Sequence, residues 1–217
     1  EFVQKLEARG TKVHWAGTAQ QACEVILGIL RAKNARVIVK SKAMTSEEIH
    51  LNEAMEQAGC EVVEADLGEF IVQLRGETPY HIVFPAMHLT RDEIRDVFQR
   101  KLGGAPSNSP EELTMVARRV LREKYLQADV GITGANFAIA ETGMLSITEN
   151  EGNARLTAAL PRTMITLVGI EKVLFASSGG ATYGEQTEFP APETHPHDPL
   201  SPYGITKATG EHYLFFY

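Results

Sequence analysis

The sequence predicts an α/β protein in which helices cover a mostly parallel sheet. Three observations lead to this class. Short β-branched runs alternate with segments of helical periodicity as far as residue 127, and strands dominate the region that follows. In addition, 43% of the 217 residues are hydrophobic, which is enough for a substantial core. We therefore expect parallel strands first and an antiparallel portion late in the chain.

The first elements follow from residue spacing. Residues 18–33 place apolar side chains at helical intervals after Thr18, which we expect to be the N-cap. Residues 35–40 form a β-branched run and are predicted to be a strand. Residues 45–59 begin with a capping-box sequence, TSEE, and end at Gly59, so a second helix is expected there.

The next four elements continue the alternation. Strands are expected over residues 60–65 and 80–86 because both runs are rich in β-branched and aromatic side chains. Amphipathic helices are expected over residues 89–103 and 109–127, the second with Pro110 in its first turn.

Later segments are strand-like or irregular. Strands are expected over residues 128–134, 144–150 and 163–169. Residues 103–110 form a loop, which we interpret as a connection within one domain. Residues 184–202 contain five prolines and should run extended over a surface.

Composition excludes several classes of protein. The net charge is −7 and no basic block occurs, which argues against a nucleic-acid-binding protein. No apolar run approaches the roughly 18 residues that a membrane span needs, and the first ten residues lack the apolar core of a signal peptide. Cys23 and Cys60 are too few for a disulfide framework or an iron–sulfur cluster. We expect two reduced, buried thiols in a cytoplasmic protein.

The histidines do not predict a metal site. His50, His81 and His88 show no metal-ligand spacing and are expected to be structural or surface residues. His195 and His197 lie in the proline-rich segment and are expected to be exposed incidentally.

Candidate ligand groups gather between residues 131 and 155, where Gly131 and Gly143 permit close backbone approach. They are Thr133, Gly134, Asn136, Glu141, Thr142, Glu149, Asn150, Glu151, Asn153 and Arg155. Arg155 can bind a substrate carboxylate through two parallel hydrogen bonds, and Glu149 or Glu151 can act as a base or nucleophile. The alternative is that these are turn residues whose polar groups are satisfied internally.

A second candidate region follows the strand predicted at residues 35–40. Lys40, Ser41 and Lys42 lie between that strand and the next helix, so two ammonium groups and free backbone N–H groups can cradle an anion. The alternative is two solvated lysines at the end of a strand.

Residues 1–173 resemble the LUD domain, specifically that of B-type lactate-utilisation iron–sulfur proteins. The resemblance rests on residues 40–74, 81–94, 111–143, 149–156 and 169–173. It implies a three-layer fold of the NagB/RpiA/CoA-transferase type and a part in oxidising L-lactate to pyruvate with other iron–sulfur and LUD subunits. In that family a Cys-rich, ferredoxin-like region follows, and it is absent here. Iron–sulfur clusters are therefore expected on a missing region or on partners, and this chain is at most an oxidoreductase subunit that binds a ligand or a partner.

Residues 174–217 resemble a fragment of NAD-dependent sugar-nucleotide epimerases and dehydratases. Tyr203 and Lys207 match the YxxxK pair of that family, and Ser178 matches its upstream serine. The pair has a physical logic, since an ammonium one helical turn away lowers the pKa of a tyrosine. No glycine-rich dinucleotide fingerprint occurs, so NAD binding and epimerase activity are not expected. Two alternatives to a lactate-utilisation component stay open: an epimerase-related protein and a non-catalytic fusion remnant.

Overall fold

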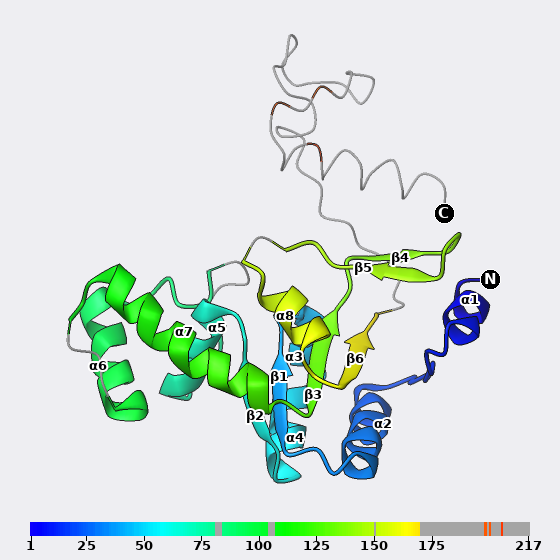
Figure 1. The fold of residues 1–217 in the computed structure, drawn as a ribbon, viewed down its shortest axis with the longest axis horizontal. Coiled ribbons are helices and arrows are strands. Elements are labelled where there is room, and N and C mark those ends of the chain that lie inside the picture. Colours follow the sequence, from blue (N-terminus) through cyan, green and yellow to red (C-terminus); the bar gives the residue numbers. More distant parts are fainter. Residues whose placement is uncertain are drawn as a thin grey trace. The chain divides into compact units, whose positions relative to one another are not determined.

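The computed structural model describes residues 1–80, 84–103, 107–149, 151–169, 198, 200 and 205. The chain divides into two compact units, Glu1–Gly169 and Ile170–Tyr217, and every element named below belongs to the first (Figure 1). Several residues singled out from the sequence lie outside the described part of the chain: His81, Asn150, Ser178, His195, His197, Tyr203 and Lys207.

The centre of the first unit is a four-stranded parallel sheet with the order β2-β1-β3-β6. Its strands are β1 (Val37–Lys40), β2 (Glu61–Glu64), β3 (Val130–Gly134) and β6 (Thr163–Leu167). A separate antiparallel pair consists of β4 (Phe137–Ile139) and β5 (Met144–Ser146). The predicted α/β class, with parallel strands first and an antiparallel portion late, is confirmed.

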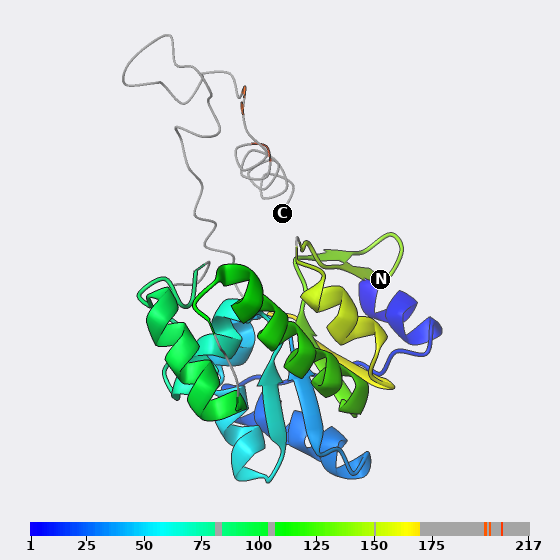
Figure 2. The ribbon, with the colours of Figure 1, turned by 60° about the vertical axis from the view of Figure 1, so that its left-hand side comes forward.

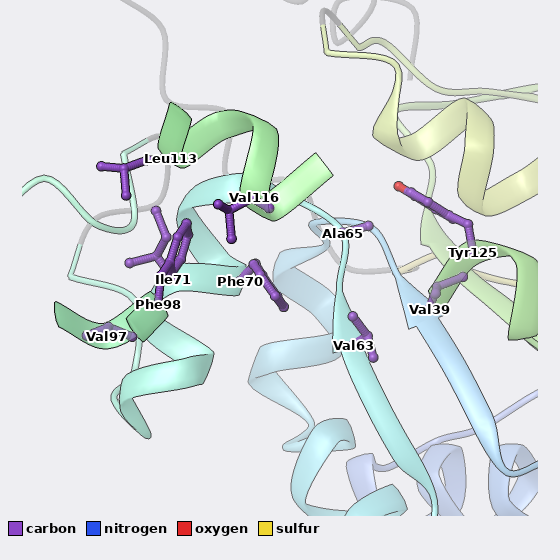
Figure 3. Packing of buried hydrophobic residues seen from close by; sticks show 11 residues of the cluster. Val39, Val63, Ala65, Phe70, Ile71, Val97, Phe98, Leu113, Val116 and Tyr125 are labelled. Carbon is purple, nitrogen blue, oxygen red and sulfur yellow. The ribbon is translucent and has the colours of Figure 1, made fainter. Parts of the chain in front are cut away.

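Helices cover both faces of this sheet (Figures 1 and 2). The helices of this unit are α1 (Phe2–Ala8), α2 (Ala19–Ala32), α3 (Met44–Glu48), α4 (Leu51–Gln57), α5 (Leu67–Arg75), α6 (Arg91–Leu102), α7 (Pro110–Gln127) and α8 (Asn153–Ala159). Of these, α1 lies beside the β4–β5 pair and not on the sheet. Because side chains alternate along a strand, Ile38 and Val62 pack with α2 and α4 on one face. Val39 and Val63 pack on the other face with α5, α6 and α7 (Figure 3). The result is a helix–sheet–helix arrangement with an apolar core on each side.

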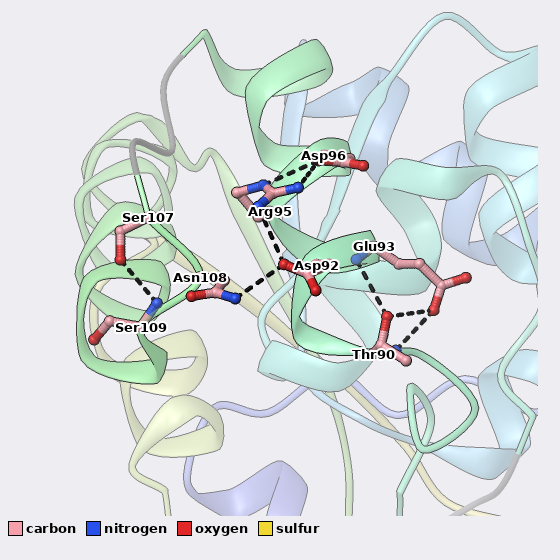
Figure 4. A network of polar contacts seen from close by, with 8 residues as sticks. All are labelled: Thr90, Asp92, Glu93, Arg95, Asp96, Ser107, Asn108 and Ser109. Carbon is pink, nitrogen blue, oxygen red and sulfur yellow. Dashed lines mark hydrogen bonds and ion pairs between the residues drawn. The ribbon is translucent and has the colours of Figure 1, made fainter.

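The helix ends explain why the predicted boundaries were close. Thr18 caps α2 by accepting a hydrogen bond from Gln21 N over 3.2 Å. Thr90 and Glu93 form a reciprocal capping box at the start of α6 (Figure 4). Pro110 occupies the first turn of α7, where its missing N–H is harmless.

The same network ties the start of α6 to the loop before α7. Asn108 Nδ2 donates to Asp92 Oδ1 over 2.9 Å, and Arg95 binds both Asp92 and Asp96 (Figure 4). These contacts agree with the prediction that this loop connects elements within one domain.

The predicted helix over residues 45–59 is wrong in its middle and at its start. It is two helices, α3 and α4, separated where His50 adopts a left-handed conformation with φ of 52°. The expected capping box does not form, because Ser46 donates to Ala43 O and accepts a hydrogen bond from Lys40. The stop at Gly59 is confirmed by its φ of 84° immediately after the end of α4.

Other expectations also need correction. Within the strand predicted at 80–86, the described residues Tyr80 and Phe84–Ala86 form no strand. Cys23 and Cys60 are free thiols, as expected, but each is only partly buried. Four elements had no counterpart in the sequence prediction: α1, α5, β4 and α8.

Candidate functional site

The carboxyl ends of β1 and β3 mark the place where the chain reverses its direction across the sheet. From β1 the chain moves outward to β2, and it then returns to β3 on the other side of β1. In open α/β sheets, ligands bind at such a switch point, outside the carboxyl ends of the strands. Ser41 N continues the pairing by donating to Ile132 O over 2.9 Å. The candidate site therefore lies along this edge, which we call the carboxyl edge.

Two oppositely charged pairs cross from β1 to β2 at the carboxyl edge. Lys40 and Glu64 are register partners, and Lys40 Nζ lies 2.9 Å from Glu64 Oε1. Two residues further along each segment, Lys42 Nζ lies 4.0 Å from Asp66 Oδ2. Parallel pairing thus produces a buried pair at the strand ends and a more exposed pair just beyond them.

Lys40 belongs to the buried polar cluster, which we define as Lys40, Ser46, Asn52, Glu64 and Glu69. The Lys40 side chain is fully buried, and its ammonium group donates to Ser46 Oγ over 3.0 Å. Asn52 Nδ2 donates to Glu64 Oε1 over 2.6 Å. The interpretation of Lys40 as a solvated lysine is therefore wrong. Its ammonium group is paired with Glu64 and Ser46, so its role at the carboxyl edge is to stabilise the strand ends.

Glu69 is the least expected member of this cluster. It is 3% exposed, and burial raises the pKa of its carboxyl to about 9, with a further rise from the charge of Glu64 and an opposing effect from Lys40. The carboxyl is therefore neutral at pH 7. Sequence reasoning missed Glu64, Asp66 and Glu69, although carboxylates directly after an apolar strand were a usable signal.

Just beyond the strand ends, the charges of half-buried Lys42, buried Asp66 and exposed Glu151 interact with one another. Partial burial raises the pKa of Glu151, the charge of Asp66 raises it further, and Lys42 lowers it. These couplings place the loop before α8 close to the end of β2. Arg155 lies in the first turn of α8, and its Nε is 3.4 Å from Oε1 of Glu149 in that loop, while 78% of the Arg155 side chain remains exposed. Most of that guanidinium can therefore reach a ligand.

The remaining predicted residues have structural partners. Thr133 is fully buried and pairs with Thr166, and Asn136 Oδ1 accepts from Thr148 N over 2.7 Å. Asn153 O accepts hydrogen bonds from Tyr125 and Thr157. These contacts fit the alternative of internally satisfied polar groups.

Three further candidates lie near turns. Glu141 O accepts a hydrogen bond from Lys5 Nζ over 2.6 Å. The Thr142 hydroxyl is buried and has no hydrogen-bond partner within the described residues. A Cβ at Gly134 would lie 3.2 Å from Ala43 Cβ, so this glycine allows the segment after β1 to pass closely.

Sequence comparison identifies the family. The profile of the LUD domain family matches residues 1–182. The chain belongs to the LUD domain family.

Individual relatives of this LUD domain carry the name lactate utilization protein B. The Bacillus velezensis protein is 51% identical over 175 residues, which is 80% of this chain and 37% of the relative. The Lysinibacillus sphaericus protein is 53% identical over 76% of this chain and 35% of the relative. The chain thus spans little more than a third of the length of these curated relatives. No solved structure matches it.

One hollow in the described part of this LUD domain lies at the opposite end of the sheet. It has a volume of about 470 Å³ and lies beside the amino ends of β1 and β2, between residues such as Arg31, Arg36 and Cys60. The charged candidates from the sequence lie at the carboxyl edge or close to the start of α8 instead, except Glu141, which lies in the turn between β4 and β5. We place the site at the carboxyl edge because fixed polar groups, and not volume alone, orient a ligand.

The described residues contain no cluster of three or more His, Cys, Asp or Glu side chains suited to a metal ion. Among them there is also no helix with the length and apolar character to cross a bilayer.

Replacing Glu69 with Gln should change how the stability of this LUD domain depends on pH. The pKa of Glu69 is about 9 in the folded protein, against an ordinary value of 4.5, so folding takes up a proton between these two pH values. The free energy of unfolding must then fall as pH rises through this window, by at most about 1.4 kcal/mol per pH unit. Glu69→Gln should remove this contribution, and at pH 8 it should be more stable than the wild type by at most about 5 kcal/mol. Urea unfolding across this pH window measures the difference.

A matched control is Glu56→Gln, at an exposed glutamate of α4. It should reproduce the pH dependence of the wild type. If Glu69→Gln showed the same slope as this control, the neutral state assigned to Glu69 would be wrong.

Proposed function

We propose that this chain is the LUD-domain part of a lactate-utilisation protein and that it binds a small carboxylate at the carboxyl edge. The observation that carries the proposal is its similarity, at about half of all aligned residues, to proteins named lactate utilization protein B. L-lactate and pyruvate are the ligands that this name suggests. Both are small anions with one carboxylate.

The carboxyl edge offers a matching set of groups. Arg155 has an exposed guanidinium, which is suited to a carboxylate because two of its N–H groups can bind the two oxygens together. Glu151 and Asp66 provide acceptors for a hydroxyl group such as that of lactate. Partial burial and the charge of Asp66 raise the pKa of Glu151 above its ordinary value, which favours a carboxyl that takes up a proton more readily than a free glutamate.

The finer assignments belong to the same proposal. The fold is of the NagB/RpiA/CoA-transferase type, and its helix–sheet–helix layers and parallel sheet support this. Oxidation of lactate needs an electron acceptor. The two cysteines of this chain are too few to bind an iron–sulfur cluster. We therefore assign the iron–sulfur clusters to partner subunits or to polypeptide outside this chain, in the cytoplasm.

The test is ligand binding by the purified chain. L-lactate or pyruvate should raise its melting temperature in proportion to the logarithm of ligand concentration, whereas a phosphosugar or CoA thioester should not. Arg155→Gln should weaken lactate binding by roughly tenfold, because a charge-assisted hydrogen bond contributes about 1.5–3 kcal/mol. Calorimetric titration measures the affinity.

Arg162→Gln provides the matched control. Arg162 is also exposed, but it precedes the amino end of β6 and so lies at the other edge of the sheet. This variant should bind lactate like the wild type. An equal loss of lactate affinity in both variants would show that the net charge of the protein, and not a site at Arg155, attracts the ligand. If the wild type did not bind lactate, the proposal would be wrong.

The epimerase-like residues Ser178, Tyr203 and Lys207 stay a prediction from the sequence. No described residue and no reported relative bears on them. Titration with NADH, followed by nicotinamide fluorescence, should give no binding.

A further inference from the structure

The first turn of α5 connects the buried polar cluster with the exposed carboxyl edge. Asp66 caps this helix by accepting a hydrogen bond from Glu69 N over 3.0 Å, and its other carboxylate oxygen faces Lys42 at 4.0 Å. The Glu69 carboxyl lies within hydrogen-bonding reach of Glu64 at the end of β2. One helical turn therefore carries a ligand-site residue at one end and a buried acid at the other.

The charges around Glu69 balance only if one proton is present. The charged groups facing it are Lys40 from β1, Glu64 from β2 and Glu47 from α3, while Ser46 and Asn52 contribute uncharged groups to the cluster. Lys40 is already paired with Glu64, so it does not neutralise a second buried carboxylate. An ionised Glu69 would be repelled by Glu64 in a region from which water is largely excluded.

Two orphaned oxygen atoms point to the same conclusion. Glu64 Oε2 and Glu69 Oε2 are buried and have no hydrogen-bond partner within the described residues. Two carboxylates can only accept hydrogen bonds, whereas a protonated carboxyl can donate one to its neighbour. A proton between the two side chains therefore removes the repulsion and supplies the missing donor.

We propose that Glu64 and Glu69 share a single proton, and that this proton holds the first turn of α5 against the end of β2 and so fixes Asp66 at the carboxyl edge. When the proton leaves, repulsion between the two carboxylates displaces the turn, and Asp66 no longer orients Lys42. The edge also gains a negative charge. Both effects weaken the binding of an anionic ligand, so the ligand site is regulated by pH; this last consequence rests on the proposed function.

The first part of the test measures the proton itself. In protein labelled with ¹³C at the glutamate carboxyl carbons, one signal should titrate at an alkaline pH, and Glu69→Gln should remove it. Glu56→Gln should leave that signal in place. A wild-type spectrum in which every glutamate titrates near its ordinary pKa would overturn the proposal.

The second part measures the helix turn. Amide hydrogen exchange of residues 66–70, corrected for the intrinsic effect of pH, should accelerate at least tenfold in the wild type as the carboxyl signal titrates. In Glu69→Gln the same amides should stay protected throughout. If amide exchange accelerated equally in both proteins, or in neither, the stability of the turn would not depend on the proton, and the proposal would be wrong.

The third part uses L-lactate as the probe. Its affinity for the wild type should fall at least threefold across the same titration, and its affinity for Glu69→Gln should change less than that. If lactate binds with no such difference, the regulation is wrong and the proposed function stands. If lactate does not bind at all, the proposed function fails, while the carboxyl signal and the exchange rates still decide whether the proton holds the turn.

Discussion

Replacing Gly131 with Ala should destabilise the protein by at least about 3 kcal/mol, because the new methyl group has no space. A Cβ at this position would lie 2.0 Å from Thr157 O and 3.2 Å from Pro161 Cγ. The first of these atoms belongs to the backbone of α8, so no side-chain rotation can relieve the overlap. Either α8 must move away from β3, or β3 must shift within the sheet.

The consequences of that shift would extend to the carboxyl edge. Helix α8 begins just after Glu151, and Tyr125 of α7 donates to Asn153 O in its first turn. Urea unfolding, monitored by far-ultraviolet circular dichroism, measures the loss of stability. If the variant does not accumulate in soluble form, that outcome agrees with the same expectation.

Gly28→Ala is the control for this variant. Gly28 lies inside α2, and a Cβ there meets nothing within 4 Å. This change should leave stability equal or raise it by up to about 1 kcal/mol, because alanine is the better helix former. A Gly131→Ala protein as stable as Gly28→Ala would show that α8 does not pack on β3 as described.

Local signals were sufficient to predict most of the framework. Thr18 and Pro110 act at helix starts through local geometry, so their effect can be read from neighbouring residues. The capping box of Thr90 and Glu93 is an equally local signal that the sequence analysis did not use. The strands β1, β2 and β3 were recognisable because each contains a short run rich in β-branched residues. Both signals depend on a few neighbouring residues and not on contacts with distant parts of the chain.

The misses arose where distant residues decide the outcome. The helix predicted over 45–59 does not form as one helix. Ser46 accepts a hydrogen bond from Lys40 and donates one to Ala43 O instead of capping a helix. Helix α8 was missed because its packing depends on Gly131, which is far away in sequence.

The candidate site divides in the same way. The strand ends and the loop before α8 were predicted to supply polar groups, and Lys42 and Glu151 do lie close together. The sequence did not indicate that Lys40 is buried, because that depends on which helices cover its face of the sheet. For the same reason it did not single out Glu64 and Glu69, whose importance arises from their burial.

Replacing Lys40 with Met should destabilise the protein by about 3–5 kcal/mol, because it leaves Glu64 as a buried carboxylate without its cation. Lys40 is fully buried and Glu64 is 4% exposed, so neither group can turn to water. Methionine keeps most of the side-chain volume, and the loss therefore reports on charge more than on packing.

Two further variants isolate the electrostatic cause. Adding Glu64→Gln to Lys40→Met removes the stranded charge and should restore at least half of the lost stability, as measured by urea unfolding in a double-mutant cycle. Lys124→Met breaks the other ion pair on β2, in which Lys124 Nζ lies 2.6 Å from Glu61 Oε1. Because both of its side chains are partly exposed, this change should cost less than about 1 kcal/mol. If Lys40→Met cost no more than Lys124→Met, the ion pair beneath the carboxyl edge would contribute no more to stability than one at the surface. The neighbouring pair of Lys42 and Asp66 would then lack a rigid support, and the coupling between the buried polar cluster and the ligand site would lose its physical basis.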